Sequence, residues 1–185
     1  NGDATCWDGR KGLWWQEEYL VQNVVSEMLS SALRSQTGEP KDADAWEALF
    51  RSFNAERSSG TRGYQDSEKI AIKVNLNTVT TQDYRENGSF TSPQIIRALL
   101  LQLVTLAGVA PADITVYDAT RVIPDGIIDA CRAPELAGVH FVDWAGGQGR
   151  EAYRRDPQCQ VHWSEMLGGN PTFLPTCVTA AAYVI

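Results

Sequence analysis

Three polar residues alternate with apolar ones in the segment 69–77, which reads KIAIKVNLN. Lys73, Asn75 and Asn77 occupy every second position, so in an extended strand their side chains point to the same face. Lysine supplies a positive charge and asparagine both a donor and an acceptor, which is the chemistry of an anion-binding site or a metal-ligand platform. A half-buried strand whose polar face meets water shows the same alternation, so both interpretations stay open.

A second group of polar residues follows two later apolar runs. Asp118, Thr120 and Arg121 come at the end of ITVYD and just after it, and Asp143 lies near the end of VHFVDW. Because the carboxyl ends of parallel strands meet at one edge of a sheet, we expect these side chains to lie near Lys73. There they could orient a polar substrate or bind a metal. Alternatively, Asp118 caps the next turn and Asp143 pairs with an arginine.

The candidate site therefore has two kinds of members. Its candidate catalytic groups are Lys73, Asp118 and Asp143, and its candidate ligand-binding groups are Asn75, Asn77, Thr120, Arg121 and Arg150. Arg150 ends the run GGQGR, which could wrap a phosphate but matches neither the dinucleotide fingerprint nor the P-loop, so a flexible turn is the simpler interpretation. The two histidines, His140 and His162, lack a partner at ligand spacing. No metal ligand is assigned, and the cofactor is unknown.

The elements that must position these groups are indicated by hydrophobic periodicity and by helix-capping residues. We expect helices over 20–33, 44–53, 93–107 and 124–131, and strands over 69–77, 114–118, 139–144, 160–163 and 177–185. A strand, a buried helix and a second strand form a βαβ unit. The pattern predicts the α/β class, a three-layer fold with a mainly parallel sheet and helices on both faces. We expect one domain, in which 1–66 is an N-terminal helical extension packed on an α/β core, 67–185.

Composition narrows the class of protein. The chain has 185 residues, 43% of them hydrophobic, and a net charge of −7, which argues against a nucleic-acid partner. No apolar stretch is long enough to span a bilayer. Its four cysteines, which form no CxxC pair, could make one or two disulfides or remain buried thiols. The tryptophans are most simply residues of the core or staples that pin loops onto it, and a platform for a sugar or an aromatic ligand is the alternative.

The two ends of the sequence suggest processing or truncation. The chain begins without methionine, and its last apolar strand stops at Ile185 with no turn and no polar tail. We therefore expect a piece of a longer polypeptide, incomplete at its C-terminus. Its partner would be the remaining C-terminal polypeptide or another protein chain, because an apolar strand with unpaired backbone groups tends to pair with another strand.

Several of these segments, in order, resemble one known family. KIAIKVNLN, the TSP that opens a helix, ITVYD and VHFVDW are similar to the proteins of the domain-of-unknown-function 362 (DUF362) family, over roughly 68–185. The resemblance implies an α/β fold distantly similar to the N-terminal part of lactate racemase-like proteins. It also implies export by a twin-arginine signal, hence a periplasmic or otherwise extracytoplasmic location, and in some members a separate iron–sulfur domain. The family's later segment with a Lys-Asn-His-type run, and ferredoxin-like cysteine spacing, are absent from this sequence.

Three functional hypotheses follow. The first is an extracytoplasmic α/β protein that binds a small polar or anionic ligand at the predicted site, either as an enzyme or as its substrate-binding half. The second is a non-catalytic binding or assembly subunit that another chain completes. The third is an iron–sulfur-associated redox protein, which the resemblance suggests and the cysteine spacing does not support.

Overall fold

The computed structural model describes residues 12–77, 90–163 and 171–185 of the chain. Cys6 and Trp7 lie outside these residues. The helices are α1 Gln22–Thr37, α2 Asp42–Glu56, α3 Pro93–Thr105, α4 Asp125–Ala130 and α5 Thr176–Thr179, with two short 3-10 turns, η1 Pro111–Asp113 and η2 Pro134–Leu136. The strands are β1 Ile70–Lys73, β2 Ile114–Asp118, β3 His140–Asp143, β4 Glu151–Ala152, β5 Arg155–Val161, β6 Thr172–Pro175 and β7 Tyr183–Val184.

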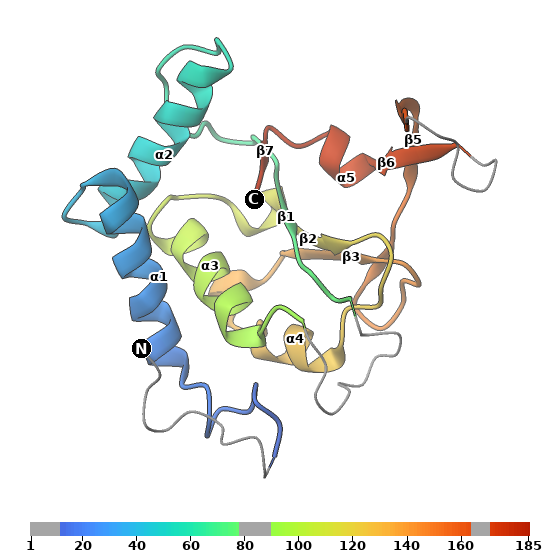
Figure 1. Ribbon diagram of the computed structural model, residues 1–185, viewed down its shortest axis with the longest axis horizontal. Coiled ribbons are helices and arrows are strands. Elements are labelled where there is room, and N and C mark those ends of the chain that lie inside the picture. Colours follow the sequence, from blue (N-terminus) through green and yellow to red (C-terminus); the bar gives the residue numbers. More distant parts are fainter. Residues whose placement is uncertain (1–11, 78–89, 164–170) are drawn as a thin grey trace.

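Five strands of the described chain form a parallel sheet in the order β4-β3-β2-β1-β7. The expected α/β architecture with a mainly parallel sheet is confirmed. In the register between β1 and β2, Lys73 lies opposite Tyr117, and in that between β2 and β3, Asp118 lies opposite Asp143. The carboxyl ends of three neighbouring strands therefore meet at one rim of the sheet. A separate antiparallel hairpin, β5–β6, stands beside that sheet (Figure 1).

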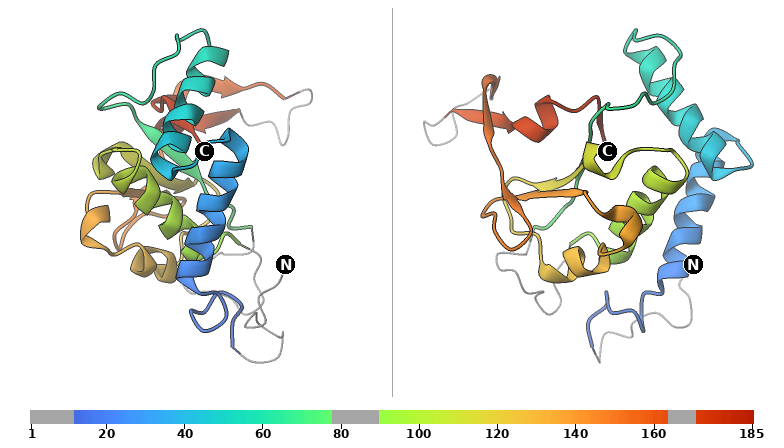
Figure 2. Two further views of the ribbon diagram at one scale, coloured as in Figure 1. Left: turned by 90° about the vertical axis from the view of Figure 1, so that its left-hand side faces the viewer. Right: turned by 180° about the vertical axis from the view of Figure 1, so that it is seen from behind.

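Alternation along the strands divides the sheet into two faces. Ile70, Ile72 and Val116 point into the main core, under α3 and α4. Ala71, Tyr117 and Val142 point to the opposite face, where they meet Tyr153 and the segment that contains α5. The helical layer is thus thick on one face, whereas one short helix and the hairpin lie on the other (Figure 2).

Helix α3 begins and ends close to where the sequence predicts. The Ser92 Oγ accepts a hydrogen bond from the N–H of Ile95 at 3.3 Å, and Pro93 takes the first helical position, where it needs no N–H partner. Beyond the helix, Gly108 adopts a left-handed φ of 73°, which glycine enters without a steric penalty. These capping residues explain why this element was predictable.

The polar stripe of α3 fixes the N-terminal helices to the core. Gln102, which is buried, accepts a hydrogen bond from the Trp46 indole at 3.1 Å and donates one to Ser30 at 2.8 Å. Gln94 donates to the carbonyl oxygen of Trp15 at 2.8 Å. The bonds of Gln102 join α3 to α1 and α2, which lie beside it on the β7 side of the sheet (Figure 1), whereas the Gln94 Oε1 is buried without a hydrogen-bond partner among the described residues.

The C-terminal segment differs from the expected strand over 177–185. Its first part, Thr176–Thr179, is one helical turn that follows Pro175, and only Tyr183–Val184 pair with β1. The β-branched residues there indicated a strand, but Pro175 lies at the N-cap and lets a helical turn start directly after β6. The strand expected over 160–163 is the end of the longer β5, and its partner β6 was not expected.

Candidate functional site

The carboxyl rim of the sheet brings Lys73 and Asp118 together. The Lys73 Nζ lies 3.2 Å from the Asp118 Oδ2, and it also donates to the carbonyl oxygen of Val74. The Lys73 side chain is 45% exposed, whereas that of Asp118 is 3% exposed. Lys73 also lies 6.0 Å from the centre of the Tyr117 ring. A half-exposed ammonium group is therefore held in place by a buried carboxylate.

Asp118 accepts other hydrogen bonds besides that of Lys73. Its Oδ2 accepts from the N–H of Leu76 at 3.3 Å, and its Oδ1 accepts from both the N–H and the hydroxyl of Thr120 at 2.9 Å. The carboxylate thus ties the end of β1 to the turn after β2. This is the turn-capping role that the sequence left open for Asp118, combined with the expected proximity to Lys73.

The polar row predicted from alternation is present. The side chains of Lys73, Asn75 and Asn77 are exposed, whereas Val74 and Leu76 between them are buried. Arg121 reaches this segment from the turn after β2, because its Nε donates to the Asn77 carbonyl oxygen at 3.1 Å. The rim therefore brings Arg121 next to the exposed row that continues β1.

Asp143 lies at the end of the neighbouring strand but is completely buried. Its Oδ1 accepts from the N–H groups of Ala145 and Gly146 at 2.9 and 2.6 Å, and its Oδ2 accepts from the N–H of Ile123 at 3.0 Å. Arg150 completes the arrangement with its Nε 3.9 Å from the Asp143 Oδ2. Asp143 thus organises the loop between β3 and β4, and its geometry favours the arginine-paired alternative over direct contact with a ligand.

Arg150 is likewise occupied within the protein. Its guanidinium group donates to the carbonyl oxygens of Ile123 and Gln148 and pairs with Asp125, and its side chain is 1% exposed. The GGQGR segment forms a tight turn in which Gly147 and Arg150 bridge to each other. The simpler interpretation of this segment, a turn, agrees with this geometry, and no phosphate could reach the Arg150 head group without rearrangement.

A groove opens next to the rim, between the turn after β2 and the β5–β6 hairpin. Its volume is about 550 Å³, within the range of small-ligand sites. This rim groove is lined by Ala119, Thr120, Tyr153, Arg155, Pro171, Thr172 and Phe173. Of the predicted site residues only Thr120 lines it, and Asp118 joins that residue to Lys73.

Sequence reasoning missed the residues that the hairpin side contributes to the rim groove. Arg155 donates to the Tyr153 hydroxyl at 3.3 Å, and the Tyr153 ring stacks on Trp144 with 5.8 Å between ring centres. Trp144 and Trp163 are 57% and 54% exposed, so neither is a residue of the core. Trp144, the last residue of the strand predicted over 139–144, was the signal that could have identified this part of the site.

The local charge of the rim contrasts with the net charge of the whole protein. Lys73, Arg121 and Arg155 gather around the carboxyl ends of the strands, and Asp118 is the one carboxylate with which any of the three forms an ion pair among the described residues. The protein as a whole carries a net charge of −7. A surplus of cations at a concave site of an acidic protein favours anionic ligands.

The opposite end of this face carries other titratable groups that form local pairs. The His140 Nδ1 lies 2.7 Å from a Glu151 oxygen, and Lys69 forms an ion pair with Asp113. Burial raises the pKa of the nearby Cys177 thiol, and the Glu151 charge adds to that rise. Cys177 is therefore a protonated thiol at neutral pH rather than a nucleophilic thiolate.

The remaining cysteines give no support to a disulfide or a metal cluster. Cys131, Cys159 and Cys177 are free thiols, and Cys6 is outside the described chain. Within residues 12–77, 90–163 and 171–185, no group of three or more His, Cys, Asp or Glu side chains is arranged to hold a metal ion. None of the described helices has the length and apolar character needed to cross a bilayer.

Comparisons with known proteins give no match: no family model, no curated protein and no solved structure is significantly similar to this chain.

Proposed function

We propose that this protein binds a small anionic ligand at the carboxyl rim of its parallel sheet, as a binding protein or as the substrate-binding part of an enzyme. The observation that carries the proposal is the half-exposed Lys73 ammonium, fixed by the buried Asp118 at the rim. Such a cation is pre-positioned, so a ligand that meets it does not have to order a flexible side chain.

The surrounding residues suggest how the ligand is held. Arg155 supplies a second cation and Thr120 a hydroxyl, and both residues line the rim groove. Asn75 and Asn77 present exposed amides on the same surface as Lys73. An anion bound at Lys73 would lie close to Asp118, which is the candidate acid/base group of this proposal.

The resemblance of the β1–α3–β2–β3 segments to DUF362 proteins supports two further parts of the proposal. The chain would be a member of that family, and it would act outside the cytoplasm. Immunoblotting of periplasmic and cytoplasmic fractions from the source cells tests the second part, and a purely cytoplasmic signal would contradict it.

Isothermal titration with inorganic phosphate, pyrophosphate and citrate, and with glucose as a neutral probe, tests the proposed binding. We expect saturable binding of at least one anion, which weakens as salt screens the charges. Replacing Lys73 by methionine (Lys73→Met) or Arg155 by methionine (Arg155→Met) should weaken that binding by about tenfold or more.

Lys41→Met is the matched control, because Lys41 is exposed at the start of α2, away from the rim, and its loss changes the net charge equally. Binding should be unchanged in this variant. The proposal is wrong if none of the anions binds saturably, or if Lys41→Met weakens anion binding as much as Lys73→Met and Arg155→Met do.

A further inference from the structure

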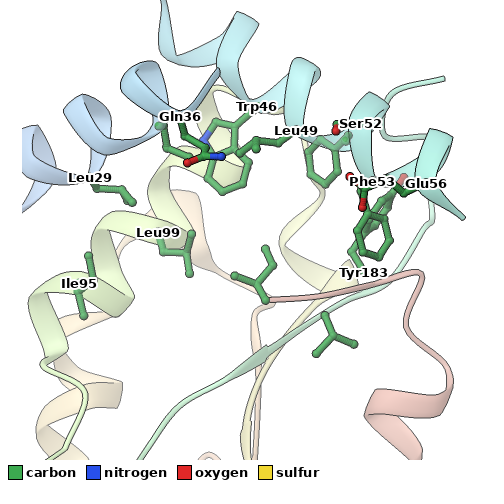
Figure 3. A pocket seen from close by; sticks show the side chains of 14 residues that line it. Leu29, Gln36, Trp46, Leu49, Ser52, Phe53, Glu56, Ile95, Leu99 and Tyr183 are labelled. Atoms are coloured by element: carbon green, nitrogen blue, oxygen red, sulfur yellow. The ribbon is translucent and has the colours of Figure 1, made fainter. Parts of the chain in front are cut away.

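A second hollow lies on the helical side of the molecule, at the edge of the sheet that is formed by β7. Figure 3 shows it between α1 and α2 above, α3 to one side and the C-terminal strand below. Its volume is about 590 Å³. We call it the edge groove, and it is lined by Leu29, Leu33, Gln36, Trp46, Leu49, Phe50, Ser52, Phe53, Glu56, Ile95, Leu99, Tyr183, Val184 and Ile185.

The edge groove exists because the helical layer extends further than the sheet beneath it. Phe50 and Phe53 of α2 pack on the Tyr183 ring, with ring centres 4.8 and 5.4 Å apart, so α2 lies over β7. In the described chain no strand follows β7 at this edge. Leu49 and Leu99 therefore remain partly exposed where a further strand would cover them.

The backbone of β7 indicates what fits there. The N–H groups of Tyr183 and Ile185 donate to Lys69 and Ala71 of the β1 side, at 3.2 and 2.9 Å. In a parallel pair, alternate residues bond to the same neighbour, so the N–H and C=O of Val184 point to the open edge. The edge groove thus adjoins an unpaired main-chain donor and acceptor, a combination that suits an extended peptide better than a lipid chain.

A second copy of this chain does not fit through the same edge. Pairing β7 with its symmetry mate would place the two strands about 4.8 Å apart. Each α2 lies over its own β7, so the two α2 helices would come closer than the roughly 8–10 Å that packed helices require. The occupant must therefore be a strand without a helical layer above it.

We propose that the edge groove binds an extended segment of another polypeptide, which adds to β7 as a sixth strand of the sheet. Apolar side chains at alternate positions of that segment fill the groove under α2, and its backbone pairs with Val184. Glu56 is the one charged side chain in the described lining, so a basic residue at the end of the segment is favoured over an acidic one. This proposal is independent of the anion site at the rim.

A labelled, end-blocked peptide of sequence KTVTLTVTK, read by fluorescence anisotropy, is the direct probe. We expect saturable binding, and slower hydrogen exchange of the Val184 amide in the complex. The same peptide N-methylated at its central residues keeps its side chains but loses main-chain donors, and should bind about tenfold or more weakly. This comparison uses the unaltered protein, so the test remains valid even if a protein variant fails to fold.

Val184→Pro removes the outward N–H without touching the bonds of Tyr183 and Ile185 to β1, and should weaken peptide binding by about tenfold. Val184→Thr keeps that N–H and is the matched control, with binding unchanged. The proposal is overturned if the peptide fails to saturate by about 1 mM, or if N-methylation has no effect. It is equally overturned if dodecanoic acid or a second copy of the chain occupies the edge groove in place of the peptide.

Discussion

At the scale of single residues, two aspartates at adjacent strand ends have different surroundings. Asp118 shares its carboxylate between the protein backbone and the half-exposed Lys73, whereas Asp143 is buried with Arg150 and backbone N–H groups. Their register in the sheet makes them neighbours, but only the first is connected to a solvent-exposed charge. Asp118 is therefore the candidate functional carboxylate of the rim, whereas Asp143 has a structural role.

The structural role of Asp143 predicts a large cost for removing its charge. Asp143→Asn leaves Arg150 buried beside a neutral amide and takes an acceptor from the N–H groups of Ala145 and Gly146. We expect the free energy of unfolding to fall by about 2–5 kcal/mol in urea titrations.

The matched control removes the other carboxylate partner of Arg150. The Asp125 side chain is 51% exposed, so Asp125→Asn should lower the free energy of unfolding by less than about 1 kcal/mol. If Asp143→Asn is as stable as the unaltered protein, then the carboxylate is not needed for folding and its proposed catalytic role regains weight.

Sequence alone predicted the exposed row better than the environment of the carboxylates. Alternation in an extended segment decides which side of it each residue faces, so the exposure of Lys73, Asn75 and Asn77 could be predicted. The Asp143 carboxylate accepts a hydrogen bond from Ile123 and pairs with Arg150. These contacts depend on how loops far apart in the sequence pack together, and no local sequence pattern encodes them.

At the scale of elements, the segments with strong capping signals were predictable and the short ones were not. Ser92, Pro93 and Gly108 define α3 by local chemistry alone. The helical turn Thr176–Thr179 has β-branched residues that favour a strand, and its conformation follows instead from its position after Pro175. Short elements depend on their tertiary surroundings more than on propensity.

The loop between β3 and β4 is unusually short for a connection between parallel strands. A parallel connection usually needs a dozen or more residues, but this one spans only 144–150. Gly146 and Gly147 make the turn possible because both adopt a left-handed φ, of 68° and 84°. Only Gly146 is also crowded, since a Cβ there would lie 2.6 Å from the Ala152 nitrogen.

This difference provides a matched pair of variants. Gly147→Ala adds only the strain of a left-handed alanine, about 1–2 kcal/mol, because nothing lies within 4 Å of its added Cβ. Gly146→Ala adds the same strain and a backbone collision, so it should cost about 1–3 kcal/mol more in the free energy of unfolding. Equal losses in both variants, measured by urea denaturation, would contradict this close approach of Gly146 to β4.

At the scale of the whole molecule, different elements cover the two faces of the sheet. The helical face holds the main core and carries the N-terminal helices, which α3 anchors through Gln94 and Gln102. The opposite face holds the hairpin, and Arg155 at the start of that hairpin lines the rim groove together with Tyr153. The sequence predicted the layers, but the extent of each layer depends on long-range packing, so neither the edge groove nor the rim groove could be foreseen.

Tyrosine and cysteine side chains that pack against the core predict how the protein responds to alkali. Burial, reinforced by the Asp113 charge, raises the pKa of Tyr64 from 10.0 to about 12, and burial raises that of Cys131 from 9.0 to about 12. Burial also raises the pKa values of Tyr117 and Tyr183. Each group holds its proton more tightly when folded, so its contribution to stability is complete below its unfolded pKa and is lost as the pH rises through the folded value.

The free energy of unfolding should therefore be steady near pH 8 and fall with increasing slope from about pH 9 toward pH 12. Tyr64→Phe and Cys131→Ala each remove one proton that unfolding would release, so each should flatten that slope, although the second also lowers stability at every pH by opening a cavity. Urea titrations at stepped pH values measure the slope directly. An unchanged slope in both variants would mean that neither group is shielded from water, and the close packing of Tyr64 and Cys131 against the core would then be wrong.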